Sequence, residues 1–208
     1  DRIFRVATES GAVPFEGARA VDAVRDASGR VTGVVFHVGA DRTPHTVLCE
    51  RLVIADGVRS PLGRVLGREW HRDTAYGVAG RSYVASTRSD DPWISSHLEL
   101  RGPAADGGDG ELLPGYGWIF PLGNGEVNLG VGALATAKRP ADLQIRPLMQ
   151  YYETLRREEW GLSGELRAPT SALLPMGGAV SGVAGPNWVV IGDAAGCVNP
   201  LNGEGIDY

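Results

Sequence analysis

The sequence predicts a mixed α/β fold, in which two strand–turn–helix units enclose a long stretch of antiparallel strands. The first unit covers residues 52–66 and the second covers residues 188–206. Each unit begins with a short apolar run, continues through a turn that contains an Asp, and ends at a helix start. Alternating apolar and polar residues between the two units indicate an antiparallel sheet. This order is typical of two modules interleaved in the sequence: a nucleotide-binding core and an inserted sheet domain.

The residues before the first unit predict a short helix and a three-stranded β-meander. Ile3–Ser10 reads as the tail of a helix, and Gly11 is a typical stop signal. Asp26–Gly29 and Gly39–Arg42 supply turn residues between the strands that follow. We expect these strands over residues 18–24, 31–38 and 45–48.

The first strand–turn–helix unit begins with Leu52–Ile54, which reads as a short buried strand. Ala55–Gly57 ends this strand. Ser60 and Pro61 then begin a helix through Leu66, because proline is favoured in the first helical turn. Taken alone, the Asp turn is more typical of a generic strand-to-helix connection than of a binding site. Two such turns at either end of an inserted sheet form a more specific pattern.

The central stretch predicts the strands of the inserted sheet. Tyr76–Ala85 and Ile94–Leu100 have strand composition, and the Gly-rich segment Gly102–Gly110 predicts a flexible surface loop. A hairpin is expected over Gly117–Pro121 and Glu126–Leu134, because the Gly-Asn-Gly sequence between these strands tolerates positive φ angles.

A helix and further extended segments complete the inserted sheet domain. Leu143–Glu159 has helical spacing, and its last residues are charged. Gly164–Ser171 is expected to be extended, with a sheet edge at residues 173–175 and a loop over residues 177–186. We expect the helix to bury one face, formed by Leu148, Tyr151, Tyr152 and Leu155.

The second strand–turn–helix unit carries the most specific pattern. Trp188–Ile191 predicts a buried strand, and Gly192–Gly196 predicts a tight turn whose small residues let a ligand approach the backbone. Asp193 suits a hydrogen bond to a sugar hydroxyl or ribityl chain, although an Asp that caps a tight turn is the alternative. The continuation through Asn199–Ile206 favours binding, because Pro200 and the paired glycines open a helix with free N–H groups.

Three aromatic residues on the hairpin allow two interpretations. Tyr116, Trp118 and Phe120 alternate along the predicted strand, so they share one face. Such a face is more often sheet core than the wall of a binding site, and spacing alone favours the core.

Composition excludes several classes of function. The net charge of −5 argues against non-specific nucleic-acid binding, and no apolar run approaches the roughly 20 residues of a membrane span. The two cysteines and four histidines match no metal-ligand spacing, so we expect no metal site. No Ser/His/Asp set or pair of acids indicates hydrolysis. Because the chain begins at Asp1 and ends inside a predicted helix, we expect it to be an internal part of a longer protein.

Taken together, these motifs resemble the geranylgeranyl reductase family of FAD-dependent oxidoreductases. The two Asp turns are similar to the second and third fingerprints of flavin monooxygenase-type FAD proteins. Tyr116–Pro121 is similar to the family's Tyr-x-Trp-x-Phe-Pro motif, and Asn128–Gly132 matches the strand that follows it. Gly192–Ile206, with its Asn-Gly-Glu-Gly-Ile sequence, resembles the actinobacterial, menaquinone-reducing branch.

The resemblance implies a partial Rossmann-like FAD-binding core of the flavin monooxygenase type, formed by residues 1–66 and 177–208. Residues 67–176 would then form an inserted antiparallel substrate domain. The family's N-terminal Gly-x-Gly-x-x-Gly turn is absent from the chain, so we expect the chain alone to bind FAD poorly and to be inactive. The implied FAD-binding residues are Asp56, Gly57, Gly192, Asp193, Pro200, Gly203, Glu204, Gly205 and Ile206.

The resemblance also implies a substrate and a reaction. A helix start at Gly203–Ile206 would lie near the flavin ring and favour its anionic reduced form. Reduced FAD would deliver a hydride to an isolated C=C bond in a prenyl chain, with menaquinone as the expected lipid. No sequence feature identifies the proton donor, so the catalytic residues stay unassigned. The residues expected to line the lipid tunnel are Tyr116, Trp118, Phe120 and Pro121.

The expected partners follow from that reaction. They are a prenyl lipid and an electron donor such as NAD(P)H or a reductase, with no nucleic acid. We expect a cytoplasmic location with peripheral contact at the inner face of the plasma membrane. Two alternatives stay open. One is an FAD-dependent hydroxylase or halogenase on the same scaffold, which would share the Asp turns but not the Tyr-x-Trp-x-Phe-Pro segment. The other is a non-catalytic prenyl-lipid carrier.

Overall fold

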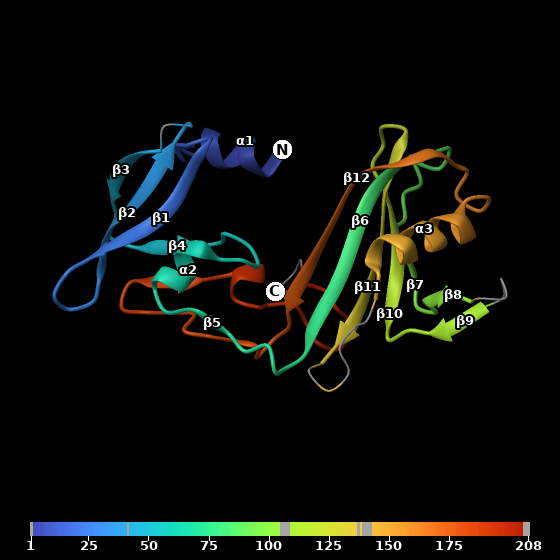
Figure 1. Cartoon of the computed structure of the whole chain (residues 1–208). Coiled ribbons are helices and arrows are strands. Elements are labelled where there is room, and N and C mark those ends of the chain that lie inside the picture. Colours follow the sequence, from blue (N-terminus) through green and yellow to red (C-terminus); the bar gives the residue numbers. More distant parts are fainter. Residues whose placement is uncertain (1, 41, 105–108, 137, 139–142, 206–208) are drawn as a thin grey trace.

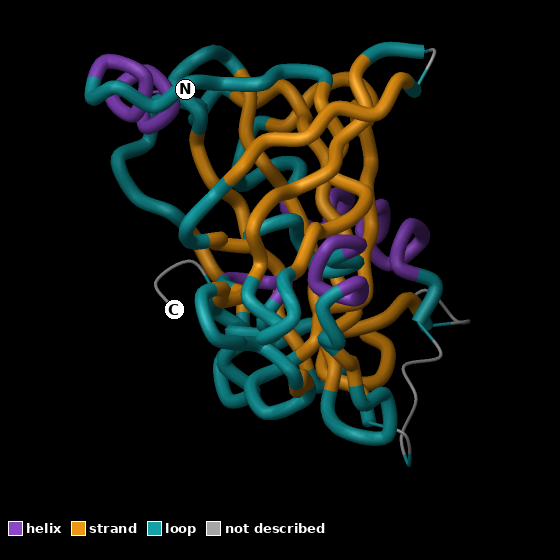
Figure 2. The backbone as a smooth tube through the Cα atoms, turned by 90° about the vertical axis from the view of Figure 1, so that its left-hand side faces the viewer, coloured by secondary structure: helices purple, strands orange, loops and turns teal. Residues whose placement is uncertain are grey.

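The computed structural model describes residues 2–40, 42–104, 109–136, 138 and 143–205. Its helices and strands form two groups, one around the N-terminal sheet and one around a larger sheet (Figure 1). In the view turned by 90°, the N-terminal helix α1 (Arg2–Glu9) lies at the upper left, beside the N-terminus (Figure 2). The predicted mixed α/β fold is confirmed.

The first group contains the predicted β-meander and a pair of parallel strands. Strands β1 (Ala18–Arg25), β2 (Val31–Val38) and β3 (Thr43–Leu48) pair antiparallel in chain order. Strand β4 (Leu52–Ile54) pairs parallel with β14 (Trp188–Val190). The short helix α2 (Pro61–Val65) follows β4, and β5 (Glu69–Trp70) pairs with β13 (Val180–Ser181).

One apolar cluster and one asparagine hold the first group together. Val31, Ile54, Leu62, Leu66, Val190 and Ala194 form the buried cluster. The side chain of Asn187 accepts a hydrogen bond from the backbone N–H of Val31 and donates to the carbonyls of Val31 and Glu50. These bonds join the meander to the strand pair, because Asn187 directly precedes β14.

The second group is an antiparallel sheet with a helix on one face. Its strands lie in the order β12-β6-β11-β10-β7, and α3 (Ile145–Arg156) packs against it. The bounds are β6 (Tyr76–Ser86), β7 (Ser95–His97), β10 (Gly115–Pro121), β11 (Glu126–Ala135) and β12 (Leu162–Pro175). A second pair, β8 (Arg101–Pro103) and β9 (Asp109–Leu112), lies beside it.

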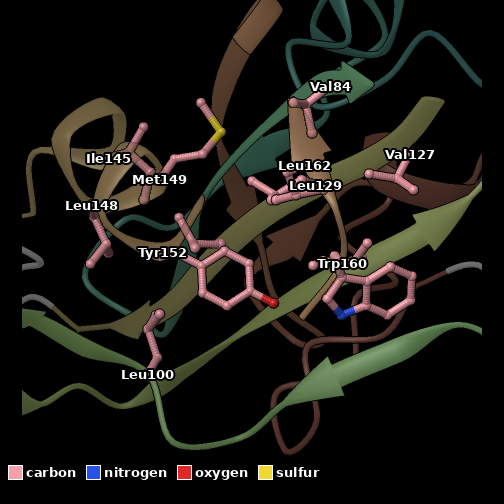
Figure 3. Close-up of a cluster of buried hydrophobic side chains, with 12 residues drawn as sticks. Val84, Leu100, Val127, Leu129, Ile145, Leu148, Met149, Tyr152, Trp160 and Leu162 are labelled. Atoms are coloured by element: carbon pink, nitrogen blue, oxygen red, sulfur yellow. The ribbon is translucent and has the colours of Figure 1, made fainter. Parts of the chain in front are cut away.

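The core of the second group lies between α3 and one face of the sheet. Leu129, Met149 and Trp160 are among its most buried side chains (Figure 3). The predicted hairpin is confirmed, with positive φ at Gly123 and Gly125. The ring of Tyr152 packs against Gly117, and its hydroxyl lies 2.6 Å from Nδ1 of His97.

Several expected elements were wrong in detail. The expected surface loop Gly102–Gly110 instead supplies residues to β8 and β9, and residues 105–108 lie outside the described residues. The expected strand Ile94–Leu100 shortens to β7. The expected loop 177–186 contains β13. In each case pairing with a distant segment, which local composition does not reveal, decides the structure.

The buried face of α3 also differs from the expected one. It runs through Ile145, Leu148, Met149 and Tyr152 at helical spacing. Leu155, which we expected on this face, is 49% exposed, because its position falls beside the stripe and near the helix end.

The end of the described chain is not helical. Gly192–Ala194 forms one turn of 3-10 helix, but residues 200–205 form a turn and irregular structure. Residues 203–205 of the expected helix start at Gly203–Ile206 are irregular, and Ile206 lies outside the described residues. The backbone N–H groups of Leu201 and Glu204 donate to the side chains of Asn199 and Asn202, each two residues earlier.

Two further facts concern the described part of the chain. None of its helices is both long and apolar enough to cross a membrane. The domain boundaries expected from the sequence, at residues 66 and 176, remain a prediction, although β5 and β13 pair across them.

Candidate functional site

The two Asp turns lie side by side at one edge of a parallel strand pair. Val190 is in register with Ile54, and the backbone N–H of Ile191 donates to the carbonyl of Ile54 at 2.9 Å. Because both strands run in the same direction, the turns that follow them leave at the same edge. The carboxyl edge of parallel strands is where α/β folds bind their ligands.

Both turns present open backbone at this edge. Gly57 and Gly192 have positive φ angles of 76° and 60°, which favour glycine. A Cβ built on either residue would have no atom within 4 Å, so nothing described fills the space beside them. A ligand could therefore approach the backbone closely at both positions.

The two acids differ in what they do within the described structure. Asp56 Oδ2 accepts a hydrogen bond from the backbone N–H of Leu62 at 2.9 Å, in the first turn of α2. This hydrogen bond agrees with the alternative interpretation of the turn, a generic strand-to-helix connection. The side chain of Asp193 is exposed at the tip of its turn.

Arg68 joins the two strand–turn units, a role that no local pattern in the sequence indicates. The side chain is 5% exposed, and its Nε donates to the carbonyl of Ala194 at 2.8 Å. Burial lowers the pKa of the Arg68 guanidinium, and the nearby charge of Asp56 opposes this shift. A single Arg after a short helix usually reads as a surface residue, so only the fold shows that Arg68 holds the Asp193 turn.

The loop after Cys197 closes on itself through backbone and Asn contacts. The N–H of Asn199 donates to the carbonyl of Glu204, and the N–H of Gly203 donates to the carbonyl of Asn199. The N–H of Gly177 donates to the carbonyl of Val198 at 2.7 Å, which anchors the loop to the end of β12. Of the predicted binding residues here, Pro200 is exposed, whereas Gly203, Glu204 and Gly205 are half-buried. Ile206 lies outside the described residues.

The aromatic face of β10 is not the face that packs on α3. Gly117 and Ile119 point to the buried core, whereas Tyr116, Trp118 and Phe120 are half-buried on the other side. Neighbouring rings lie 5.9 Å and 6.3 Å apart between centroids. Pro121, at the end of the strand, is half-buried and in register with Val127. The sheet-core interpretation of the aromatic residues therefore does not describe this face.

The fold brings the loop of residues 198–205, called the closing loop below, against this aromatic face. Gly203 has a φ of 69°, and a Cβ on it would lie 3.4 Å from Cε1 of Tyr116. Burial raises the pKa of the Tyr116 hydroxyl, and the charge of Glu204 raises it further. Two segments that the sequence proposed separately, one for a cofactor and one for a substrate, thus lie against each other.

Comparison with solved structures identifies the class of proteins that share this fold. The structure matches the geranylgeranyl bacteriochlorophyll reductase-like protein of Thermoplasma acidophilum with a TM-score of 0.73 at 19% identity, over 99% of this chain and 48% of that one. It matches a flavin-dependent brominase with a TM-score of 0.63 at 20% identity, over 96% of this chain and 48% of that one. The fold is therefore that of FAD-dependent oxidoreductases and halogenases.

Sequence comparison narrows this class. The chain is 67% identical over all 208 residues to the menaquinone reductase of Mycolicibacterium smegmatis, covering 48% of that protein. It is 31% identical to digeranylgeranylglycerophospholipid reductase 1 of Methanopyrus kandleri, over 97% of this chain and 50% of that protein. The predicted resemblance to the geranylgeranyl reductases is thus confirmed. No family model matches the chain, which spans about half the length of these relatives.

Proposed function

We propose that the protein containing this chain is an FAD-dependent reductase that saturates a C=C bond in the prenyl chain of an isoprenoid lipid, with menaquinone as its substrate. The observation that carries this proposal is the contact between Gly203 and Tyr116. It joins the loop expected to bind the flavin to the aromatic face expected to hold the lipid. The names of the two relatives, both prenyl-lipid reductases, support the same reaction class.

The residues present fit a flavin. Gly57 and Gly192 leave open backbone on neighbouring turns, and the exposed carboxylate of Asp193 suits a hydroxyl group of the ribityl chain. The closing loop would approach the flavin ring system with three of its residues, Gly203, Glu204 and Gly205. Asp56 would act through the first turn of α2, which it caps. When bound, FAD supplies the hydride for the reduction.

The aromatic face suits a prenyl chain, because it is apolar and rigid. The indole N–H of Trp118 donates to Oδ1 of Asn128 at 3.0 Å, which fixes the ring. Tyr116 and Phe120 flank it on the same strand. Such a wall would orient the alkene and exclude water from the reacting carbon atoms. We further propose peripheral membrane contact from the cytoplasm, where the lipid enters.

An anaerobic assay of the full-length protein tests the proposal. The purified protein is expected to show a flavin absorbance spectrum. After dithionite reduction, addition of menaquinone should reoxidise the flavin and yield a quinone two mass units heavier in its prenyl tail. Two matched variants sharpen the test: Trp118→Leu should slow product formation, whereas the exposed Trp93→Leu should leave it unchanged.

The alternatives give different results in the same assay. Product that forms only when oxygen is admitted would replace the reductase with a hydroxylase or with a halogenase, the class of the brominase that shares this fold. A full-length protein that carries no flavin but still binds the prenyl lipid would leave only the lipid carrier.

A further inference from the structure

A cavity rich in arginine lies between the first group of elements and the larger sheet. It measures about 750 Å³, which is in the range of small-molecule sites. Its wall comes from the turn after β4, from α2 and β5, and from residues 171–173 of β12. None of the predicted FAD-binding or lipid-binding residues lines it.

The charge of this cavity is strongly positive in an otherwise acidic chain. Arg59, Arg64, Arg68 and Arg72 line it, with Glu69 as the single acid. Within the described residues, none of the four arginines lies within ion-pair distance of a carboxylate. Four arginines that face one space lined by a single acid repel one another, and an anionic ligand would relieve this repulsion.

Two side chains of the wall carry buried donors that lack acceptors. Arg68 is 5% exposed, and its Nη2 has no hydrogen-bond partner among the described residues. The indole N–H of Trp70 is also buried without a partner. Leaving a buried charged donor unsatisfied costs roughly several kcal/mol, so an acceptor bound in the cavity would recover free energy at Arg68.

The other side chains of the wall indicate which kind of molecule would carry the anionic group. Arg72 lies over the ring of Trp70, with its guanidinium carbon 4.7 Å from the ring centroid. Val58, Ala172 and Leu173 supply apolar surface to the same cavity. The volume exceeds that of a single phosphate, and several guanidinium groups suit a group with several oxygens.

We infer that this cavity is a second site, separate from the flavin site, for the diphosphate group of a small molecule. Two sources share that chemistry: a nicotinamide dinucleotide that donates electrons, or a prenyl diphosphate that is reduced. The first source rests on the proposed function, whereas the second would replace menaquinone as the substrate. The anion site itself rests on neither.

The test uses FAD-loaded full-length protein and isothermal titration with inorganic diphosphate at low ionic strength. We expect one diphosphate to bind per chain, and Arg64→Gln and Arg72→Gln each to weaken it about tenfold, the loss of one charged hydrogen bond. Arg146→Gln, at an exposed position on α3 away from the cavity, is the matched control and should leave binding unchanged. Competition by NADPH or by geranylgeranyl diphosphate then identifies the source, and either result supports the site.

Three outcomes would overturn the inference. The first is that diphosphate does not bind, and the second is that Arg146→Gln weakens binding as much as the cavity variants do. The third is that Arg64→Gln and Arg72→Gln lose FAD instead, which would assign the cavity to the flavin. Because binding is measured without turnover, failure of the anion site leaves the proposed reductase activity untouched, and the reverse also holds.

Discussion

The indole ring of Trp118 lies against the backbone of Gly130 on the neighbouring strand. The two residues are paired in register across β10 and β11, and a Cβ on Gly130 would collide with the ring. Gly132, two residues further along β11, faces the same side of the sheet. A Cβ on Gly132 would lie 3.5 Å from its nearest neighbouring atom, which is an ordinary contact distance. The position of the Trp118 ring therefore requires that Gly130 has no side chain, whereas position 132 has space for a methyl group.

Gly130→Ala should displace the Trp118 ring and destabilise the full-length protein by about 1–3 kcal/mol, because the sheet has no space for the methyl group. Thermal unfolding and tryptophan fluorescence measure both effects. Gly132→Ala should change neither, since its methyl group would make ordinary contacts. Equal destabilisation by both substitutions would contradict the arrangement.

Gly203→Ala tests whether the closing loop belongs to the flavin site. Its positive φ makes alanine unfavourable by about 1–2 kcal/mol, and the new methyl group would press on Tyr116. We expect flavin affinity to fall about tenfold, or about 1.4 kcal/mol, in a fluorescence titration of the full-length protein. Gly164→Ala carries similar backbone strain at φ 78° with nothing within 4 Å, so it should leave flavin affinity unchanged. A normal affinity in Gly203→Ala would remove the loop from the site.

Two substitutions at Asp56 separate its structural role from a role in binding. Asp56→Ala removes the acceptor for the Leu62 N–H and should cost about 0.5–2 kcal/mol of stability. Asp56→Asn retains an acceptor oxygen without the charge, so thermal stability should change little. If Asp56→Asn also binds flavin as tightly as the unmodified protein, the carboxylate acts as a cap and not through its charge.

His97 should make the stability of the protein depend on pH. Burial lowers the pKa of His97 below its usual value of 6.5, and the charge of Arg156 lowers it further. The unfolded chain therefore binds a proton before the folded chain does, so stability should fall as the pH drops below about 6.5 and level off below the folded pKa. His97→Asn should flatten this part of a plot of melting temperature against pH. His45→Asn, at an exposed position in β3, controls for the loss of a histidine. An unchanged slope in His97→Asn would show that other groups cause the dependence.

Local patterns predicted the parts of the site but not their assembly. The Asp56 and Asp193 turns, the alternation of Tyr116, Trp118 and Phe120, and the Gly203 loop are all visible in short stretches of sequence. The contact between Gly203 and Tyr116 is not, and neither is the buried position of Arg68. Within the expected helix start at Gly203–Ile206, residues 203–205 are irregular, and Gly203 has a positive φ angle that an α-helix does not contain.

The sequence by itself determined the longer strands and the glycine turns, because periodicity and turn chemistry act between residues that are close along the chain. Only the tertiary structure decided that β4 and β14 lie side by side, that the aromatic residues face away from α3, and that four arginines surround one cavity. These features arise from contacts between distant segments. Their free energy comes from buried surface and from long-range hydrogen bonds such as that between Arg68 and Ala194, which no local pattern encodes.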